Sequence, residues 1–299
     1  MRVTQGMLAN NAMRNLSRSY QMLGKYQDQM NTGKKIQRPS DDPVVAMKGM
    51  FYRTNLTEIE QYKRNLTESY QWMENSEGGI EHAQQVVHRV RELLVQAKNG
   101  TNSPEDLKSI EVEINQLKED LIGVANTQVA GRYIFNGTKT DQPAISKNSD
   151  GSYTYHFESS DFMVEVSKGV QLKSNVDGLN AFGEKLESGD NLFETLEKIQ
   201  AALNSGNMSG SEDFLNDINA HFDTMNAERS ELGARYNRLE LIEDRLSNQE
   251  ITANKTLSEN EDADIEKVIM NLTIQESLHR ASLAVGSRLI QPTLMDFLR

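Results

Sequence analysis

Residues 32–43 decide the fold, and their sequence is Thr32-Gly33-Lys34-Lys35-Ile36-Gln37-Arg38-Pro39-Ser40-Asp41-Asp42-Pro43. A second motif, near the other end of the chain, reads Glu261-Asp262-Ala263-Asp264. Long amphipathic helical stretches flank both motifs. This layout predicts that the two ends of the chain associate into one coiled stem while the middle projects outward. We therefore expect function to lie in assembly more than in a pocket.

Composition and charge limit the classes of protein that this chain can represent. It has 299 residues, so two or three packed units are expected. Hydrophobic residues make up 37% of the chain and the mean hydropathy is -0.63, which favours elongated helices that bury a stripe over one compact core. The net charge of -12 removes the electrostatic driving force for binding DNA or RNA.

Several kinds of chemistry and targeting have no support in the sequence. The chain has no cysteine, which excludes disulfides, thiolate catalysis and Cys-ligated zinc. No apolar run approaches the roughly 20 residues of a membrane-spanning helix. The first residues, 1–6, lack the apolar core of a signal peptide, so we expect no cleaved signal. The chain is then either cytoplasmic or exported by another route.

Apolar residues at helical spacing cover most of the first half of the chain. A terminal helix is predicted to end at Gly33. Asp42 and Pro43 are predicted to cap and open a second helix, whose coiled-coil spacing continues over residues 56–94. The pair Gly78-Gly79 within it indicates a kink or a close approach of another segment.

Further helices are expected on both sides of a β-rich segment. Ser103 is predicted to cap a helix that folds back antiparallel on its predecessor. In the second half, a helix over 191–203 with Asp190 as its cap, a long helix from Ser211, and a last helix from about Ala263 follow.

The β-rich segment is confined to the middle of the chain. Aromatic and apolar residues alternate over 153–157 and again over 162–166, so these two runs are predicted to pair as a β-hairpin across residues 158–161. We interpret residues 138–185 as a small inserted domain. Because it interrupts helices that can pair without it, we expect the stem to fold in its absence.

No catalytic, cofactor or metal site can be assembled from the sequence. Residues 178–185 approach a phosphate-binding loop, but Glu184 stands where the lysine belongs. The five histidines lack the spacing of a helical zinc site. The acids of residues 259–264 suit the N-terminus of a helix without any ion. The sequence therefore predicts a protein that is not an enzyme and has no cofactor.

The helices at the two ends carry apolar stripes that one pair of helices cannot bury alone. For residues 56–125 and 215–246 we expect internal packing, whereas neighbouring copies are expected to cover the rest of the terminal stripes. The predicted assembly interface consists of Leu8, Leu16, Tyr20, Leu23, Ile265, Ile269, Leu272, Leu278, Leu289, Leu294, Phe297 and Leu298.

Three motifs, in the same order along the chain, resemble the bacterial flagellin family. Residues 32–43 resemble the flagellin N-terminal signature, and residues 261–264 match the acidic sequence that opens its C-terminal helix. Residues 232–238, Leu-Gly-Ala-Arg-Tyr-Asn-Arg, resemble a third segment of the family. The motif residues carried over are Gly33, Arg38, Asp41, Asp42, Asp262 and Asp264.

Within the flagellin family, residues 125–127 and 131–140 resemble the hook-associated members that lie between hook and filament. Pro43 and the start Val3-Thr4-Gln5 differ from the residues that are usual in flagellins, and both differences favour the hook-associated members. A divergent flagellin is the alternative within the family. A cytoplasmic coiled-coil adaptor is the competing class outside it.

The resemblance implies a mainly α fold with a small β insert, in which both termini form an elongated antiparallel helical bundle or coiled-coil stem. Residues 1–42 would be an inner-tube helix and connector, and residues 262–299 the second inner-tube helix. The two halves of the stem would be residues 43–137 and 186–261, and the insert, residues 138–185, would face solvent.

The resemblance also implies partners and a location. Copies of the chain would assemble into a ring between the first hook-associated protein and flagellin. Export would proceed through the flagellar type III apparatus to the extracellular flagellum. A cytoplasmic chaperone would hold the C-terminal region before export. Nucleic acid binding and membrane insertion are not expected.

Overall fold

The protein folds into helices and short β-hairpins, which a computed structural model describes for residues 5–99, 102–148, 152–186, 189–206 and 211–290. The chain divides into two units, unit 1 (residues 1–58 and 249–299) and unit 2 (residues 59–248). Helices α2 (Pro43–Lys98) and α5 (Ser211–Glu261) contribute residues to both units. The predicted fold class, mainly helical with a small β insert and with paired chain ends, is confirmed.

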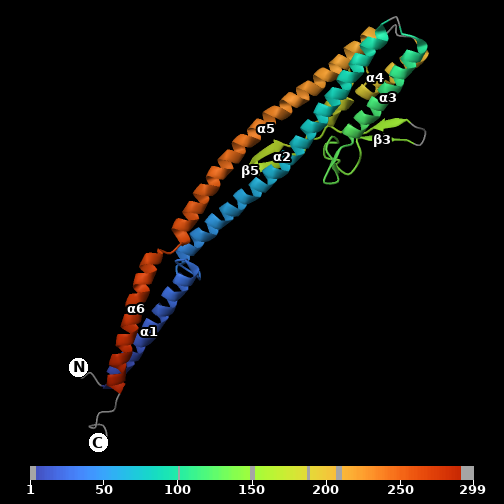
Figure 1. The fold of residues 1–299 in the computed structure, drawn as a ribbon. Helices are drawn as coiled ribbons and strands as arrows, with labels where there is room; N and C mark the ends of the chain where they lie inside the picture. The colour runs from blue at the N-terminus through green and yellow to red at the C-terminus, as the bar shows by residue number, and fades with distance from the viewer. Residues whose placement is uncertain (1–4, 100–101, 149–151, 187–188, 207–210, 291–299) are drawn as a thin grey trace, which may run out of the picture. The chain divides into compact units, whose positions relative to one another are not determined.

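Unit 1 is built on an antiparallel pair of helices, α1 (Gln5–Thr32) and α6 (Ile265–Ile290), which lie side by side in Figure 1. Between them, Gln275 Nε2 donates a hydrogen bond of 3.0 Å to Ser19 Oγ. Helix α1 ends where the sequence predicts, because Gly33 adopts a φ of +67° and its N–H donates to the Gln29 carbonyl at 2.9 Å. Glycine takes this left-handed conformation without the penalty of a Cβ.

In unit 2, α2 and α5 run antiparallel (Figure 1). They supply about half of the buried apolar side chains of that unit. Side-chain contacts agree with the antiparallel arrangement, because Gln84 Nε2 donates to Asn226 Oδ1 at 2.8 Å and Arg229 Nε donates to the earlier Glu77 Oε1 at 2.6 Å. The apolar seam predicted for these helices is buried. Its least exposed side chains include Met73, Ile80, Val87, Val90, Leu94, Ile218, Met225, Leu239 and Leu246.

Two shorter helices pack in unit 2, α3 (Pro104–Ala125) and α4 (Leu192–Ser205). Ser103 caps α3 as predicted, and its hydroxyl accepts from the Asp106 N–H. The prediction that Asp190 caps α4 is wrong. Asn191 takes that position and accepts from the Glu194 N–H at 2.9 Å, while Asp190 forms an ion pair with Lys198 instead.

The glycine pair in α2 marks a close approach. Helix α2 continues through Gly78 and Gly79, and a Cβ on Gly79 would lie only 2.8 Å from Cζ of Phe135. Phe135 is fully buried and packs edge-on against Phe182. The absence of a side chain at Gly79 therefore lets the Phe135 ring pack against α2.

In the described part of the chain the strands form three two-stranded antiparallel hairpins, and their pairing differs from the prediction. Strands β1 (Gln128–Val129) and β2 (Arg132–Tyr133) pair, as do β3 (Ile145–Lys147) and β4 (Tyr153–Tyr155). The third hairpin joins β5 (Met163–Ser167) to β6 (Val170–Lys173). The predicted pairing of residues 153–157 with 162–166 is wrong, because Gly169, with a φ of +71°, allows β5 to turn back directly on β6.

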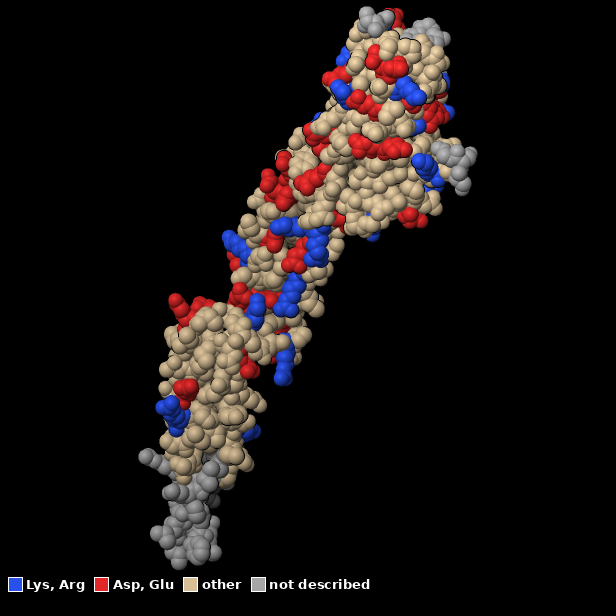
Figure 2. All heavy atoms as spheres, turned by 45° about the vertical axis from the view of Figure 1, so that its right-hand side comes forward, with Lys and Arg blue, Asp and Glu red and all other residues tan. Residues whose placement is uncertain are grey.

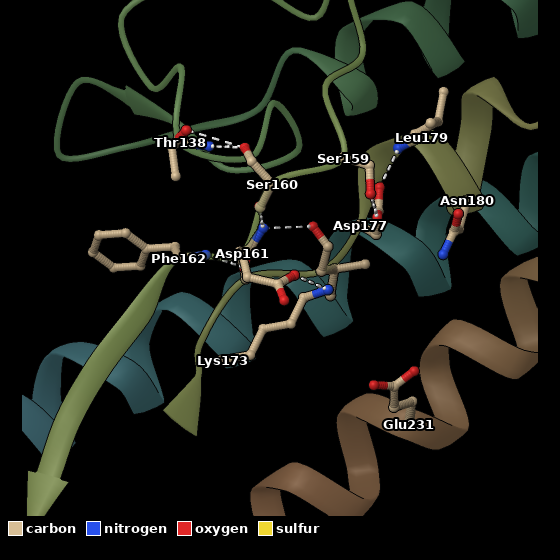
Figure 3. Close-up of polar contacts among 12 residues, drawn as sticks. Thr138, Ser159, Ser160, Asp161, Phe162, Lys173, Asp177, Leu179, Asn180 and Glu231 are labelled. Carbon is tan, nitrogen blue, oxygen red and sulfur yellow. Dashed lines mark hydrogen bonds and ion pairs between the residues drawn. The ribbon is translucent and has the colours of Figure 1, made fainter. Parts of the chain in front are cut away.

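The segment that was expected to turn between those runs, residues 158–161, forms a polar network instead (Figure 3). The Ser160 hydroxyl accepts from the Thr138 N–H at 2.8 Å, and the Ser159 hydroxyl donates to Asp177. Asp161 forms an ion pair of 2.6 Å with Lys173 on β6. These contacts hold residues 158–161 against neighbouring loops of the insert.

The insert shares its buried surface with the helices of unit 2. Trp72 of α2 is buried and stacks on Phe162 with ring centroids 5.3 Å apart. The buried hydroxyls of Ser69 and Ser174 lie 2.9 Å apart, and Arg235 Nη1 donates to the Asn175 carbonyl at 2.8 Å. Removal of residues 138–185 would expose the buried Trp72 and Ser69, and folding of the stem without the insert stays a prediction.

Candidate assembly interface

The two motifs at the ends of the chain meet in unit 1 through their backbones. Lys34 and Asp262 form an antiparallel β-bridge. The Lys35 N–H donates to the Glu261 carbonyl at 2.6 Å, and the Ala263 N–H donates to the Gly33 carbonyl at 2.7 Å. We call this contact, residues 33–35 with residues 261–263, the clasp. It confirms that the two motifs are paired in space.

A nearly buried carboxylate lies behind the clasp. The Glu261 side chain is 6% exposed, and its Oε2 lies 2.6 Å from Arg53 Nη2 and 3.6 Å from Lys34 Nζ. Gly49 of α2 makes room for it, because a Cβ at that position would collide with Glu261 Oε1. A buried charge needs such partners. Glu261 therefore joins α2 to the end of α5 within unit 1.

Lys34 and Asp262 also pair through their side chains. Lys34 Nζ donates to Asp262 Oδ1 at 2.7 Å, and the Ser258 hydroxyl donates to Asp262 Oδ2 at 2.5 Å. The shared hydrogen bond raises the pKa of Lys34 and lowers the pKa of Asp262. Since the two side chains are 40% and 45% exposed, solvent screens the pair and its net stabilisation is small.

The remaining acids of the two motifs stabilise turns and helix starts. Asp41 Oδ2 accepts from the N–H groups of Arg38 and Gln37 at 3.0 and 3.2 Å, and these bonds lower the pKa of Asp41. Asp42 caps α2 by accepting from the Val44 and Val45 N–H groups. Asp264 likewise accepts from the Lys267 N–H at 3.2 Å at the start of α6. These three family-motif acids thus have local structural roles.

The predicted interface residues are distributed over two environments. Half-buried positions in the α1–α6 pair are Leu16, Leu23 and Leu272. Exposed positions are Tyr20 (68%), Ile265 (41%), Ile269 (48%) and Leu278 (52%). Leu8 and Leu289 lie in α1 and α6, but their side chains are outside the described part, and Leu294, Phe297 and Leu298 lie outside the described residues altogether.

The exposed apolar side chains of α6 form two stripes, one on each side of its contact with α1. One stripe holds Ile265, Ile269 and Leu283, and the other holds Met270, Ile274, Leu278 and Val285. Helical spacing at 3.6 residues per turn places the half-buried Leu272 and Gln275 between the two stripes. Sequence reasoning assigned Leu278 to the interface but missed its neighbours Met270 and Ile274.

Helix α1 repeats this arrangement. Met13 and Tyr20, seven residues apart, lie on one flank of the α6 contact, and Met7 and Met22 lie on the other, with exposures of 41–68%. Across the described residues, 17 exposed large hydrophobic side chains belong to unit 1 and four to unit 2. Charged side chains are sparse over α1 and α6 on the face shown in Figure 2. In the described part of the chain no helix is long and apolar enough to cross a membrane.

These features define a class of protein, a helical protein whose paired ends expose apolar side chains. The chain belongs to the bacterial flagellin family, because the flagellin N-terminal helical region matches residues 3–140 and the C-terminal helical region matches residues 215–298. It is therefore a structural component of the bacterial flagellum.

Individual relatives match most of the chain. It is 28% identical to flagellar hook-associated protein 3 of Escherichia coli K12, over 94% of this chain and 95% of the relative. It is 25% identical to flagellin of Bacillus subtilis 168, over 95% of each. The crystal structure of the flagellar junction protein FlgL from Legionella pneumophila matches with a TM-score of 0.59 and 19% identity, over 72% of this chain and 100% of that one. At that identity the structural match shows the fold alone.

Proposed function

We propose that this chain is the junction subunit between the flagellar hook and the flagellin filament. The observation that carries the proposal is the apolar surface on both flanks of the α1–α6 pair. The proposal is supported by the full-length similarity to a protein named flagellar hook-associated protein 3. An adaptor of this kind needs no active site, because its work is to match two lattices of subunits.

The two-sided apolar surface favours a ring of copies over a two-fold dimer. A two-fold contact uses the same patch on both partners, and one such patch would leave the second stripe of α6, with Met270 and Ile274, facing water. A head-to-tail contact buries one flank of each copy against the opposite flank of the next. Repeated around an axis, such a contact closes into a ring when its rotation closes, and otherwise gives an open helix; the ring is the form proposed here.

The remaining partners follow from the position in the flagellum. The ring would contact the first hook-associated protein on the hook side and flagellin on the filament side. The subunit would travel through the flagellar type III apparatus without a cleaved signal peptide, with a chaperone on its C-terminal region until export. Its final location would be extracellular, at the hook–filament junction.

A divergent flagellin is the second candidate, because the Bacillus subtilis flagellin matches the same span of the chain. Deletion of the gene separates the two functions. If the chain is the junction subunit, cells lacking it carry hooks without filaments and release flagellin into the medium. If deletion leaves normal filaments, the junction function is refuted. If instead the filament protein itself disappears, the chain is the flagellin.

A further inference from the structure

A groove in unit 1 differs from the apolar stripes by its charge. It has a volume of about 530 Å³ and lies between the C-terminal half of α1 and the connector of residues 33–42. Arg18, Lys25 and Arg38 line it and are exposed. Lys35 lines it as well, together with the carboxylates of Asp28 and Asp41, and the charges of Lys25 and Arg38 help to lower the pKa of Asp41. With four cations against two carboxylates, the groove carries net positive charge.

A side-chain hydrogen bond to the backbone joins the two walls of the groove. Gln29 Nε2 donates to the Lys35 carbonyl at 2.6 Å, which ties the connector to α1. A Cβ on Gly24 would have nothing within 4 Å, so one wall is open backbone. Met22, 41% exposed, places an apolar side chain on the α1 wall, four residues from Arg18 and three from Lys25. The groove thus presents an apolar contact point between cations, and Asp28 and Asp41 add two carboxylates to its lining.

The distribution of charge along the chain indicates what would occupy this groove. Residues 1–58 hold nine Lys and Arg against four Asp and Glu, a net charge of +5. Residues 249–299, the other segment of unit 1, hold five against eight, so unit 1 has a net charge of +2. Residues 59–248 hold 18 Lys and Arg against 32 Asp and Glu, a net charge of -14. Opposite charge on two parts of identical subunits favours contact between the first part of one copy and the second part of another.

The outer face of α5 in unit 2 has the matching pattern. Leu241 is 72% exposed, the highest value among the large hydrophobic side chains of the described residues. Glu240 and Asp244 are exposed beside it on one side. Arg238 and Arg245, three residues before it and four after it, flank its other side. The patch therefore presents an apolar side chain with carboxylates on one side and guanidinium groups on the other, and the groove holds groups of opposite charge for both.

We propose that the groove of one copy docks the Leu241 face of α5 in a second copy. Leu241 packs on Met22, and the carboxylates of Glu240 and Asp244 meet the groove cations. Asp28 faces the arginine side of the patch. The contact is head-to-tail and so extends the proposed function, on which it rests, by naming a contact between neighbouring copies in the ring.

Disulfide crosslinking tests the contact directly, because the chain has no cysteine of its own. The test variant is Lys25→Cys with Glu240→Cys, expressed in place of the natural chain, and flagella are isolated and treated with a mild thiol oxidant. The expected result is a ladder of crosslinked multimers that reductant abolishes. Each single-cysteine variant should stay monomeric, because a head-to-tail contact brings together two different positions. The matched control, Lys25→Cys with the exposed Glu105→Cys, should also give no ladder.

Two outcomes separate this inference from the proposed function. If the double-cysteine chain is present in isolated flagella but gives no ladder, the contact is refuted while the junction function stands. If the natural chain is absent from isolated flagella, the proposed function fails first.

A charge-reversal series decides the matter if the double-cysteine chain is not incorporated. Lys25→Glu should reduce swimming at least several-fold, and adding Glu240→Lys should restore most of it. Failure of the second substitution to restore swimming in chains that are incorporated would overturn the contact.

Discussion

The packing of unit 2 makes a quantitative prediction at two leucines of the same helix. Leu239 of α5 is 0% exposed in the seam with α2, whereas Leu241, two residues further, is 72% exposed. Leu239→Ala removes buried methyl groups and leaves a cavity, so we expect a loss of about 2–5 kcal/mol in the free energy of unfolding. Leu241→Ala removes side-chain atoms that face water in the monomer, so its loss should stay below about 0.5 kcal/mol.

The assay is urea and thermal unfolding of the purified monomer, followed by circular dichroism at a helix wavelength. For a unit of this size each kcal/mol lowers Tm by about 2–4 °C, so the two variants should differ clearly in Tm. Leu241→Ala is the matched control, because it makes the same substitution in the same helix. Equal losses at the two positions, or a loss below about 0.5 kcal/mol for Leu239→Ala, would refute the helical register described here.

Three further predictions concern the clasp, the core and the terminal helices. Glu261→Ala should weaken the clasp by about 1–2 kcal/mol, given that its partner Arg53 is 63% exposed. Hydrogen exchange at the Lys35 and Ala263 amides should then become about tenfold faster. The control variant Glu259→Ala should change neither exchange rate. Burial lowers the pKa of His221 from 6.5 to about 4. Because the unfolded chain therefore binds a proton at this histidine at a higher pH than the folded chain does, the free energy of unfolding should fall by about 3 kcal/mol as the pH drops from 6.5 to 4. His221→Gln should remove that part of the pH dependence, while the part due to carboxylates persists. Residues 1–32 and 265–299 should be cut rapidly by protease in the free monomer and resist it in assembled flagella, because their exposed stripes become buried only on assembly. Resistance in the monomer would contradict ordering on assembly. Leu272→Asp should abolish junction function and leave the Tm of unit 2 unchanged.

Local chemistry made the helix ends predictable from the sequence. Gly33, Asp42 and Ser103 act through atoms within a few residues of themselves, so their roles could be predicted without knowledge of the fold. Asp190 shows the limit of that reasoning, because Asn191 offers the same capping chemistry one position later. Asn191 caps α4, while Asp190 forms an ion pair with Lys198.

Contacts between distant residues could not be predicted in this way. The buried Glu261 depends on Arg53, 208 residues earlier, and on the small Gly49. No periodic pattern relates these three positions. The strand pairing failed for a similar reason, since alternation identifies strands but the tight turn at Gly169 selects the partner of β5.

The seam and the insert show how far a hydrophobic pattern can be interpreted. Leu117 and Leu239 occupy equivalent positions in their patterns, yet Leu239 is fully buried and Leu117 only half-buried. The pattern gives the face of a helix but not what packs on it. Likewise, nothing in the sequence of residues 138–185 indicates that Trp72 of α2 stacks on Phe162.

The position of the chain in the flagellum is the most direct test of the account. A short epitope placed between Lys168 and Gly169, the exposed turn between β5 and β6, allows gold labelling of isolated flagella in the electron microscope. The account predicts a single band of gold where the hook meets the filament, in cells whose swimming is normal. Gold along the whole filament would identify a flagellin, and flagella without any gold would contradict the structural role at the junction.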